Sequence, residues 1–109
     1  MHFVPVKSVT QQAQGMVLKV RDTLIGQRTA LINTVRGHAA EFGVIAGKGA
    51  GKIVPLLSAI EQEVAIPPEA KEMFALLGQQ IDEIEVRISE VDAKLNAAHK
   101  ASREIFATF

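Results

Sequence analysis

Hydrophobic residues recur with a strict period in the second half of the chain. From Ala70 to Ile105 one row of positions, apolar except for one serine, alternates steps of four and three over five heptads. A repeat of 3.5 residues is typical of a helix that packs along a narrow seam. With Pro68 in a favourable first position, the pattern predicts a long helix over residues 68–106. Its predicted coiled-coil seam consists of Phe74, Leu77, Ile81, Ile84, Ile88, Val91 and Leu95.

A second amphipathic segment lies in the first half of the chain. Ser8, followed three residues later by Gln11, forms a capping-box pattern that begins a helix, and Gly43 is a natural stop. Apolar residues between them share the spacing of one helix face. We therefore expect a helix over residues 8–42. Its apolar positions are Val9, Ala13, Val17, Val20, Leu24, Leu31, Val35 and Phe42.

The intervening residues predict a loop over 43–52 and a short helix over 53–65, with Pro55 tolerated in its first turn. The two long helices would measure about 50 and 55 Å at 1.5 Å per residue. Similar lengths favour an all-α fold in which they form an antiparallel coiled-coil hairpin, with the short helix between them. Alternatively the heptad helix pairs with its own copy in a dimer, and one assembly can contain both pairings.

Residues 1–7 have a different character from the rest of the chain. They suggest a short extended piece, which Pro5 confines to a sheet edge or to no sheet at all. A piece this short does not form a sheet by itself. We therefore expect residues 1–7 to be the remnant of a missing N-terminal domain, followed by a helical segment over 8–109.

The charges of the two halves are opposite. Residues 1–52 hold seven basic and two acidic side chains, a balance of +5, and residues 53–109 hold five basic and ten acidic ones, a balance of −5. Either the two halves pair with each other or the basic half faces an anionic partner. Arg87 and Asp92 flank the predicted seam, so a cross-helix ion pair is also possible.

Several classes of site are excluded or disfavoured by composition. The chain has no Cys, so it has no disulfide or thiolate metal site, and a reducing cytoplasmic location is permitted. No stretch approaches the roughly 20 apolar residues of a membrane span. The histidines His2, His38 and His99 are scattered, without metal-ligand spacing. The acidic residues of the heptad helix occupy solvated positions without a pocket. We expect no cofactor, no metal, no membrane partner and no catalytic residue.

Arginines on the first long helix are the main candidates for binding an anionic partner. Arg21, Arg28 and Arg36 lie within about a quarter of the helix circumference at 100° per residue. Such a stripe fits contacts with nucleic-acid phosphates. It equally fits pairing with the acidic last helix, and the sequence leaves both interpretations open.

A glycine-rich loop adds two lysines to these candidates. The stretch 46–53 is similar to a phosphate-binding P-loop, but Ala46 and Ile53 replace its first Gly and its Ser or Thr, and no strand precedes it. A nucleotide site is therefore nearly excluded. Lys48 and Lys52 remain candidates for contact with a phosphate backbone.

Three glycines mark the face of the first helix opposite its apolar side. Gly15, Gly26 and Gly37 are eleven residues apart, and Asn33 shares their face. A glycine inside a helix is less stable than alanine by up to about 1 kcal/mol. Either another backbone, from a helix or a nucleic acid, approaches closely there, or a long helix simply tolerates the glycines.

Several motifs together resemble one family of proteins, the insertion-sequence transposases with an N-terminal DEDD, RuvC-like domain and a C-terminal serine domain (IS-one-ten family, IS-eleven-eleven group). The resemblance covers nearly the whole chain but only the middle of such a protein, and its most specific part runs from Gln27 to Gly43. The matching motifs are Phe3-Val4-Pro5-Val6-Lys7-Ser8, Gln11-Gln12, Arg21-Asp22-Thr23-Leu24, Gln27-Arg28-Thr29-Ala30-Leu31-Ile32-Asn33-Thr34-Val35-Arg36-Gly37-His38 and Glu41-Phe42-Gly43.

The resemblance implies a role without catalysis. The family's metal-binding acidic residues and its serine domain have no match here, so the chain would be a truncated transposase, inactive alone. In the family the middle region is a coiled coil implicated in assembling protomers and in contacting guide RNA and DNA. The resemblance includes Arg28, Asn33 and Arg36.

We therefore expect a helical segment for protomer assembly and nucleic-acid contact in DNA transposition. Its partners would be DNA or structured guide RNA, together with a second copy that pairs through the heptad helix. The alternative is a stand-alone coiled-coil adaptor that dimerises without binding nucleic acid.

Overall fold

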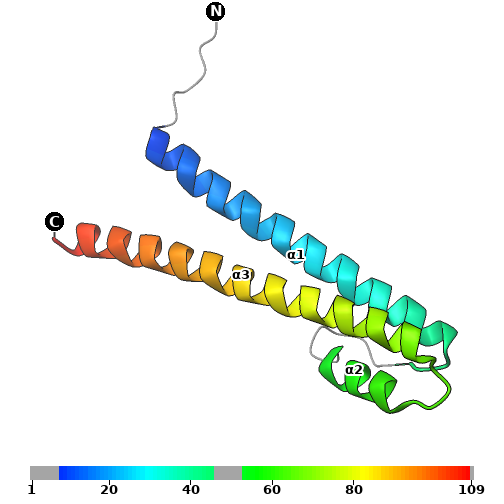
Figure 1. Cartoon of the computed structure of the whole chain (residues 1–109). Helices are drawn as coiled ribbons and strands as arrows, with labels where there is room; N and C mark the ends of the chain where they lie inside the picture. The colour runs from blue at the N-terminus through cyan, green and yellow to red at the C-terminus, as the bar shows by residue number, and fades with distance from the viewer. Residues whose placement is uncertain (1–7, 46–52, 109) are drawn as a thin grey trace, which may run out of the picture.

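The computed structural model describes residues 8–45 and 53–108, and it contains three helices in this part of the chain. They are α1 (Val9–Glu41), α2 (Ile53–Gln62) and α3 (Pro68–Thr108). Two long helices with a short one between them make an all-α fold, as predicted (Figure 1). The extended piece predicted over residues 1–7 and most of the predicted loop over 43–52 lie outside the described residues.

Both ends of α1 have the local signals that the sequence predicted. The Ser8 hydroxyl accepts a hydrogen bond from the backbone N–H of Gln11 at 3.1 Å, and the Gln11 side chain accepts one from the N–H of Ser8 at 3.1 Å. At the other end Gly43 has φ +81°. The N–H groups of Gly43 and Val44 donate to the carbonyls of Ala40 and Ala39, each at 2.9 Å. This pair of bonds is a Schellman motif, which ends the helix.

The short helix ends earlier than the sequence pattern suggested. α2 stops at Gln62 rather than at residue 65, and the N–H of Glu63 donates to the carbonyl of Ile60 in a tighter turn. Ile66 follows in this turn and is buried. Pro67 disfavours a helical conformation for the residue before it, and burial of Ile66 holds the turn against the helices. α3 then begins at Pro68 and runs to Thr108, two residues beyond the predicted end.

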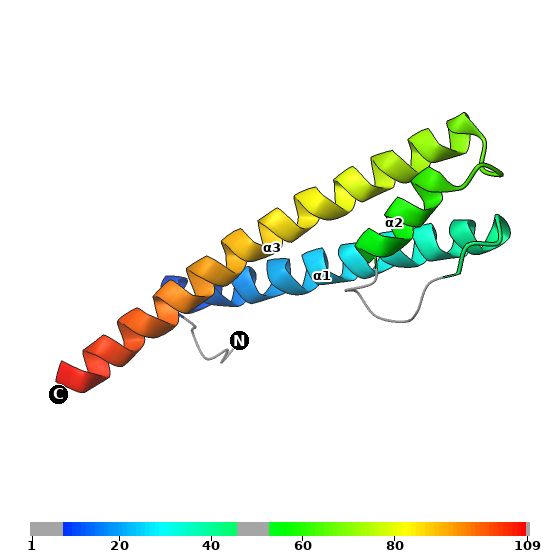
Figure 2. The same cartoon turned by 90° about the horizontal axis from the view of Figure 1, so that it is seen from below.

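The long helices α1 and α3 run antiparallel. Arg21 in the first half of α1 pairs with Asp92 in the second half of α3, and the Phe42 ring at the end of α1 meets the Phe74 ring near the start of α3. In Figure 1 the helices overlap near α2 and diverge towards their far ends, whereas in Figure 2 they are apart near α2 and cross at the far ends. The molecule is accordingly elongated, with extents of 63 × 39 × 21 Å.

The first turns of α1 do not pack as the apolar pattern predicted. Val9 is 82% exposed, and Ala13 is exposed as well. The first apolar position of that pattern to be partly buried is Val17. The reason is tertiary, because α3 has diverged from α1 at this level and the first turns have no surface to cover.

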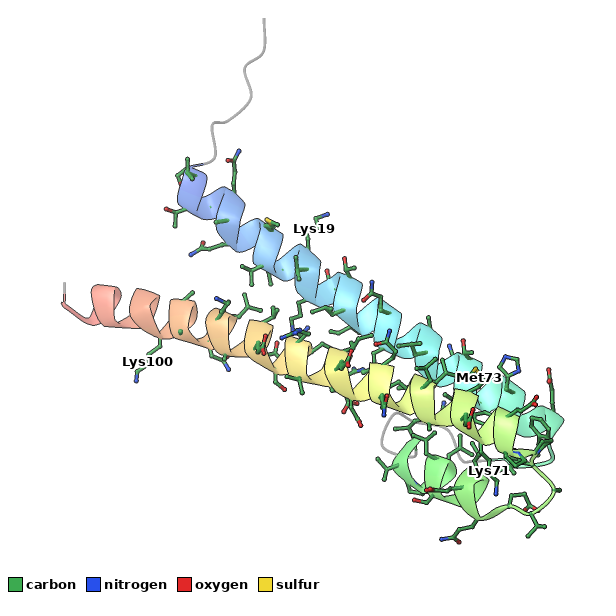
Figure 3. All side chains as sticks on the ribbon, viewed as in Figure 1. Lys19, Lys71, Met73 and Lys100 are labelled. Atoms are coloured by element: carbon green, nitrogen blue, oxygen red, sulfur yellow. The ribbon has the colours of Figure 1, made fainter. Side chains whose placement is uncertain are left out.

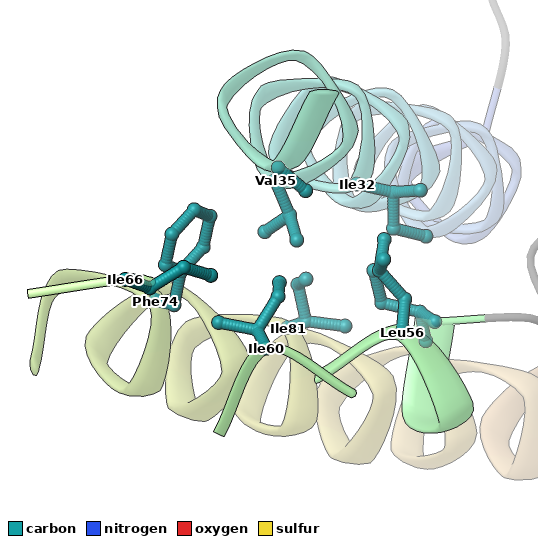
Figure 4. Packing of buried hydrophobic residues seen from close by; sticks show 9 residues of the cluster. Ile32, Val35, Leu56, Ile60, Ile66, Phe74 and Ile81 are labelled. Atoms are coloured by element: carbon teal, nitrogen blue, oxygen red, sulfur yellow. The ribbon is translucent and has the colours of Figure 1, made fainter. Parts of the chain in front are cut away.

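The core lies where all three helices meet. Ile32 and Val35 of α1 face Leu56 and Ile60 of α2 and Ile81 of α3 in Figure 4. Burying one such side chain contributes about 1.5–3 kcal/mol. The buried cluster also includes Ala39, Ile53, Ile66 and Phe74. α2 therefore closes the core at the end of the hairpin where the chain turns back.

Glycine at position 78 permits the close approach of α2. A Cβ atom added to Gly78 would lie 3.2 Å from Cδ1 of Leu57, which is tighter than an ordinary contact. Lys71, one turn before Phe74, donates from Nζ to the carbonyl of Glu61 at 2.8 Å. This bond satisfies a carbonyl that the end of α2 would otherwise leave without a helical partner.

Candidate functional site

Arg21 takes part in pairing the two long helices. Its Nε donates to Oδ1 of Asp92 on α3, and the two side chains are 38% and 41% exposed. Asp92, one of the two charged residues that flank the predicted seam, thus forms a cross-helix ion pair with Arg21. Arg87, the other charged residue flanking the predicted seam, pairs instead with Glu90 of its own helix at 3.2 Å. One candidate phosphate ligand is therefore engaged within the hairpin.

Arg28 faces the same side of α1 as Arg21, and it is partly buried. Positions 17, 21, 24, 28, 31 and 35 alternate steps of four and three, so both arginines belong to the row of α1 that faces α3. Sequence reasoning missed this row because it followed only apolar residues. Within the described part of the chain Arg28 forms no ion pair. Arg36 is also partly buried.

The remaining nucleic-acid candidates do not gather at one place in the described residues. Asn33 is exposed on the opposite face of α1. Around the glycines of that face, Gly15, Gly26 and Gly37, an added Cβ would meet nothing within 4 Å. No other described segment of the chain approaches them there. Lys48 and Lys52 lie outside the described residues.

The predicted seam of α3 divides into two rows of different burial. Phe74, Ile81 and Ile88 are buried, whereas Leu77, Ile84, Val91 and Leu95 are only partly buried. The buried residues lie towards α1 and α2. Leu77, Ile84 and Val91, the second row, lie on the side of α3 that is turned away from α2, because Gly78 and Lys71 occupy the side towards α2.

A groove between α1 and α3 opens on this second side. It has a volume of about 350 Å³. The rings of Phe42 and Phe74, which both line it, lie with their centroids 6.2 Å apart and their planes at 72°. Figure 3 shows Met73, one of its lining residues, on the side of α3 away from Lys71. The groove is lined by Thr34, His38, Phe42, Ala70, Met73, Phe74, Leu76 and Leu77.

The described surface combines apolar and basic side chains. No described group of three or more His, Cys, Asp or Glu side chains is placed to hold a metal ion. No described helix is long and apolar enough to cross a membrane. The surface offers instead an apolar groove, a row of partly exposed aliphatic side chains and the arginines of α1.

The chain is similar to transposases of insertion sequences. A protein of Sinorhizobium fredii named as a transposase, y4pF/y4sB, is 43% identical over 101 residues, which are 93% of this chain and 26% of that protein. The transposase for insertion sequence element IS1111A of Coxiella burnetii is 35% identical over 107 residues, 95% of this chain and 29% of that protein. A Pseudomonas aeruginosa protein named as a family 20 transposase is 35% identical over 89% of this chain and 30% of its own length.

Over most of its length the chain is therefore related to transposases of insertion sequences. It spans less than a third of the length of these curated relatives. No family model matches the chain, and no solved structure matches it significantly. Because the aligned stretches cover 89–95% of the chain, they include most of both long helices.

Proposed function

We propose that this chain is a helical segment of an insertion-sequence transposase that assembles protomers and contacts nucleic acid during DNA transposition. The observation that carries the proposal is the similarity to transposases along nearly the whole helical hairpin. An elongated hairpin with a partly exposed apolar side supports the assembly role. The chain itself would perform no cleavage.

The nucleic-acid contact is proposed for Arg28, Asn33 and Arg36 of α1 and for Lys48 and Lys52. DNA or a structured guide RNA would be the partner. Arg28 supports this role because it is partly exposed and no described carboxylate neutralises it. Arg21 is the weakest candidate among the arginines, since Asp92 already pairs with it.

The test is salt-dependent binding of the purified chain to structured RNA and to duplex DNA. Removing one phosphate contact reduces the slope of log K against log [salt] by roughly 0.7–0.9. We expect Arg28→Ala to weaken binding and to reduce this slope by about that amount. Lys94→Ala, an exposed lysine on the acidic α3, is the matched control and should leave both quantities unchanged. Equal losses of affinity in the two variants would speak against a specific role for Arg28.

The second candidate function is a dimerising adaptor that binds no nucleic acid. The Arg21–Asp92 pair favours it, because it shows that an arginine of α1 can serve helix pairing alone. A stable dimer that binds neither RNA nor DNA at low salt would establish the adaptor over the transposase segment.

The absence of catalysis is tested on the same samples. Incubation of the chain with a DNA substrate and Mg²⁺ should leave the DNA intact. Cleavage that does not occur in a mock preparation lacking the chain would refute this part of the proposal.

A further inference from the structure

A second groove, which we call the acidic groove, lies between α2 and α3. It has a volume of about 540 Å³, which is within the range of ligand-binding clefts. The exposed residues of its lining include Val54 and Glu61 of α2 and Glu72, Ala75 and Asp82 of α3. None of the candidate arginines of α1 belongs to its described lining. The acidic groove is therefore a different surface from the proposed nucleic-acid contact.

The apolar side chains of this lining are only partly covered by the fold. Val54 is 67% exposed, and Ala75 is exposed as well. Leu57 lies against Gly78 and remains partly buried. Exposed apolar side chains gathered in a groove are typical of a site that receives apolar side chains of a partner.

The charged side chains of the lining are mostly acidic. Within the described part of the chain, the carboxylates of Glu61, Glu72 and Asp82 form no ion pair. Lys71, which lies between α3 and α2 in Figure 3, donates from Nζ to the backbone carbonyl of Glu61 rather than to a carboxylate. Residues 53–86, which contain the whole described lining, hold seven acidic and one basic side chain, a balance of −6. This charge attracts cationic groups and repels phosphates.

We propose that the acidic groove binds a basic amphipathic helix of a protein partner. The apolar side of that helix covers Val54, Leu57 and Ala75, and its Lys or Arg side chains reach the carboxylates of Glu72 and Asp82. Packing of an amphipathic helix into a groove is a recurrent mode of peptide recognition. The inference goes beyond the proposed function, because it assigns a second class of partner to a surface that the nucleic-acid contact does not use.

The dimensions and the mixed character of the groove select this occupant. From Lys71 to Asp82 the α3 side is about 17 Å long, which matches about three turns of a partner helix. Three turns present an apolar stripe together with basic side chains beside it, and the aliphatic stems of those side chains can cover Val54. A small cation would leave the apolar side chains exposed, and a nucleic-acid backbone would meet the carboxylates with its own negative charge.

The test is a titration of the ¹⁵N-labelled chain with a model peptide, followed by NMR. The peptide has about 20 residues, enough to form a helix, with Leu along one face and Lys elsewhere. We expect the backbone signals of Ser58, Gly78 and Gln79, which line the groove, to shift on binding. The signals of Gly26 and Gly37, exposed on α1, should stay in place. A peptide with Glu in place of Lys, and one with the same composition in shuffled order, should leave all these signals unchanged.

Charge reversal at neighbouring positions provides a matched pair of variants. Asp82 lines the groove, whereas Glu83 is exposed outside the described lining. Asp82→Lys replaces an attraction with a repulsion, each worth about 0.2–1 kcal/mol, so it should weaken binding of the Lys peptide by about 2- to 30-fold. Glu83→Lys changes the net charge equally and should leave the affinity nearly unchanged at 0.15 M salt, where the Debye length is about 8 Å.

A second pair of variants tests the apolar contact. Val54→Ser should weaken binding of the Lys peptide, because it removes an apolar side chain from the lining. Val64→Ser, at a position that is 93% exposed outside the described lining, should not. Both side chains are mainly exposed, so neither change should disturb the fold, and the unshifted signals of α1 verify this for each variant.

The outcomes separate this inference from the proposed function. Equal weakening by Asp82→Lys and Glu83→Lys, or equal binding of the shuffled peptide, would mean non-specific attraction and would overturn the docking site. The absence of shifts at millimolar peptide, or shifts confined to the groove between α1 and α3, would overturn it too. Duplex DNA that shifts the signals of Ser58 and Gly78 would make nucleic acid the occupant instead. Binding of nucleic acid through α1 is decided separately by the salt experiment with Arg28→Ala.

Discussion

At the residue scale, the Arg21–Asp92 pair connects the two long helices but remains in contact with solvent. Its side chains are 38% and 41% exposed, so water and salt screen the attraction. Half-exposed ion pairs contribute about 0.2–1 kcal/mol in double-mutant cycles. We expect Arg21→Ala, Asp92→Ala and the double variant to give a coupling energy in that range by urea unfolding. The coupling should fall in 1 M NaCl, where the Debye length is about 3 Å. A coupling unaffected by salt would mean that the pair is shielded from solvent.

Glycines of α1 and of its C-terminal turn have opposite roles. Gly26 is exposed inside the helix and an added Cβ meets nothing within 4 Å, so Gly26→Ala should stabilise the chain by up to about 1 kcal/mol. Gly43 has φ +81°, where a Cβ costs roughly 1–2 kcal/mol, so Gly43→Ala should destabilise it. Thermal unfolding of both variants checks the two signs. Stabilisation by Gly26→Ala with loss of RNA binding would indicate that a nucleic-acid backbone approaches this face. Destabilisation would point instead to packing against a second copy.

At the scale of elements, α2 closes the core of the hairpin with three buried side chains, Ile53, Leu56 and Ile60. Ile60 is 1% exposed at the centre of the core, whereas Val64, just beyond α2, is 93% exposed. We expect Ile60→Ala to lower the free energy of unfolding by about 2–5 kcal/mol. Val64→Ala should stay within about 0.5 kcal/mol of the unmodified chain. Chemical denaturation of the two variants gives the comparison. Similar values would mean that α2 detaches from the hairpin in solution.

At the scale of the whole molecule, the proposed assembly of protomers makes a prediction about shape. One chain is 63 Å long, and two hairpins packed side by side should double the mass with little change in this dimension. A dimer joined end to end would instead approach twice the length. Small-angle X-ray scattering combined with light scattering on the same sample distinguishes the two. A longest dimension near twice that of one chain would exclude side-by-side packing of the hairpins.

Local sequence patterns were sufficient to predict the two long helices of this chain. The Ser8–Gln11 capping box, the Gly43 stop and the start at Pro68 depend on hydrogen bonds and dihedral angles within a few residues, and the heptads of α3 depend on the helix period alone. For this reason the all-α class could be predicted. The end of α2 at Gln62 could not, because it is set by the buried Ile66 and by packing against α3.

The candidate site depended much more on tertiary structure. Charge and spacing selected Arg21, Arg28 and Arg36, but the two uses of an arginine, pairing with α3 or binding an anion, have the same local sequence signal. Only the register of α1 against α3 assigned Arg21 to Asp92. The same register buried one row of the α3 repeat and left Leu77, Ile84 and Val91 partly exposed. Helix formation is local, so the sequence by itself determined the helices. Burial and ion pairing depend on which surfaces meet across the chain, and only the tertiary structure decided them.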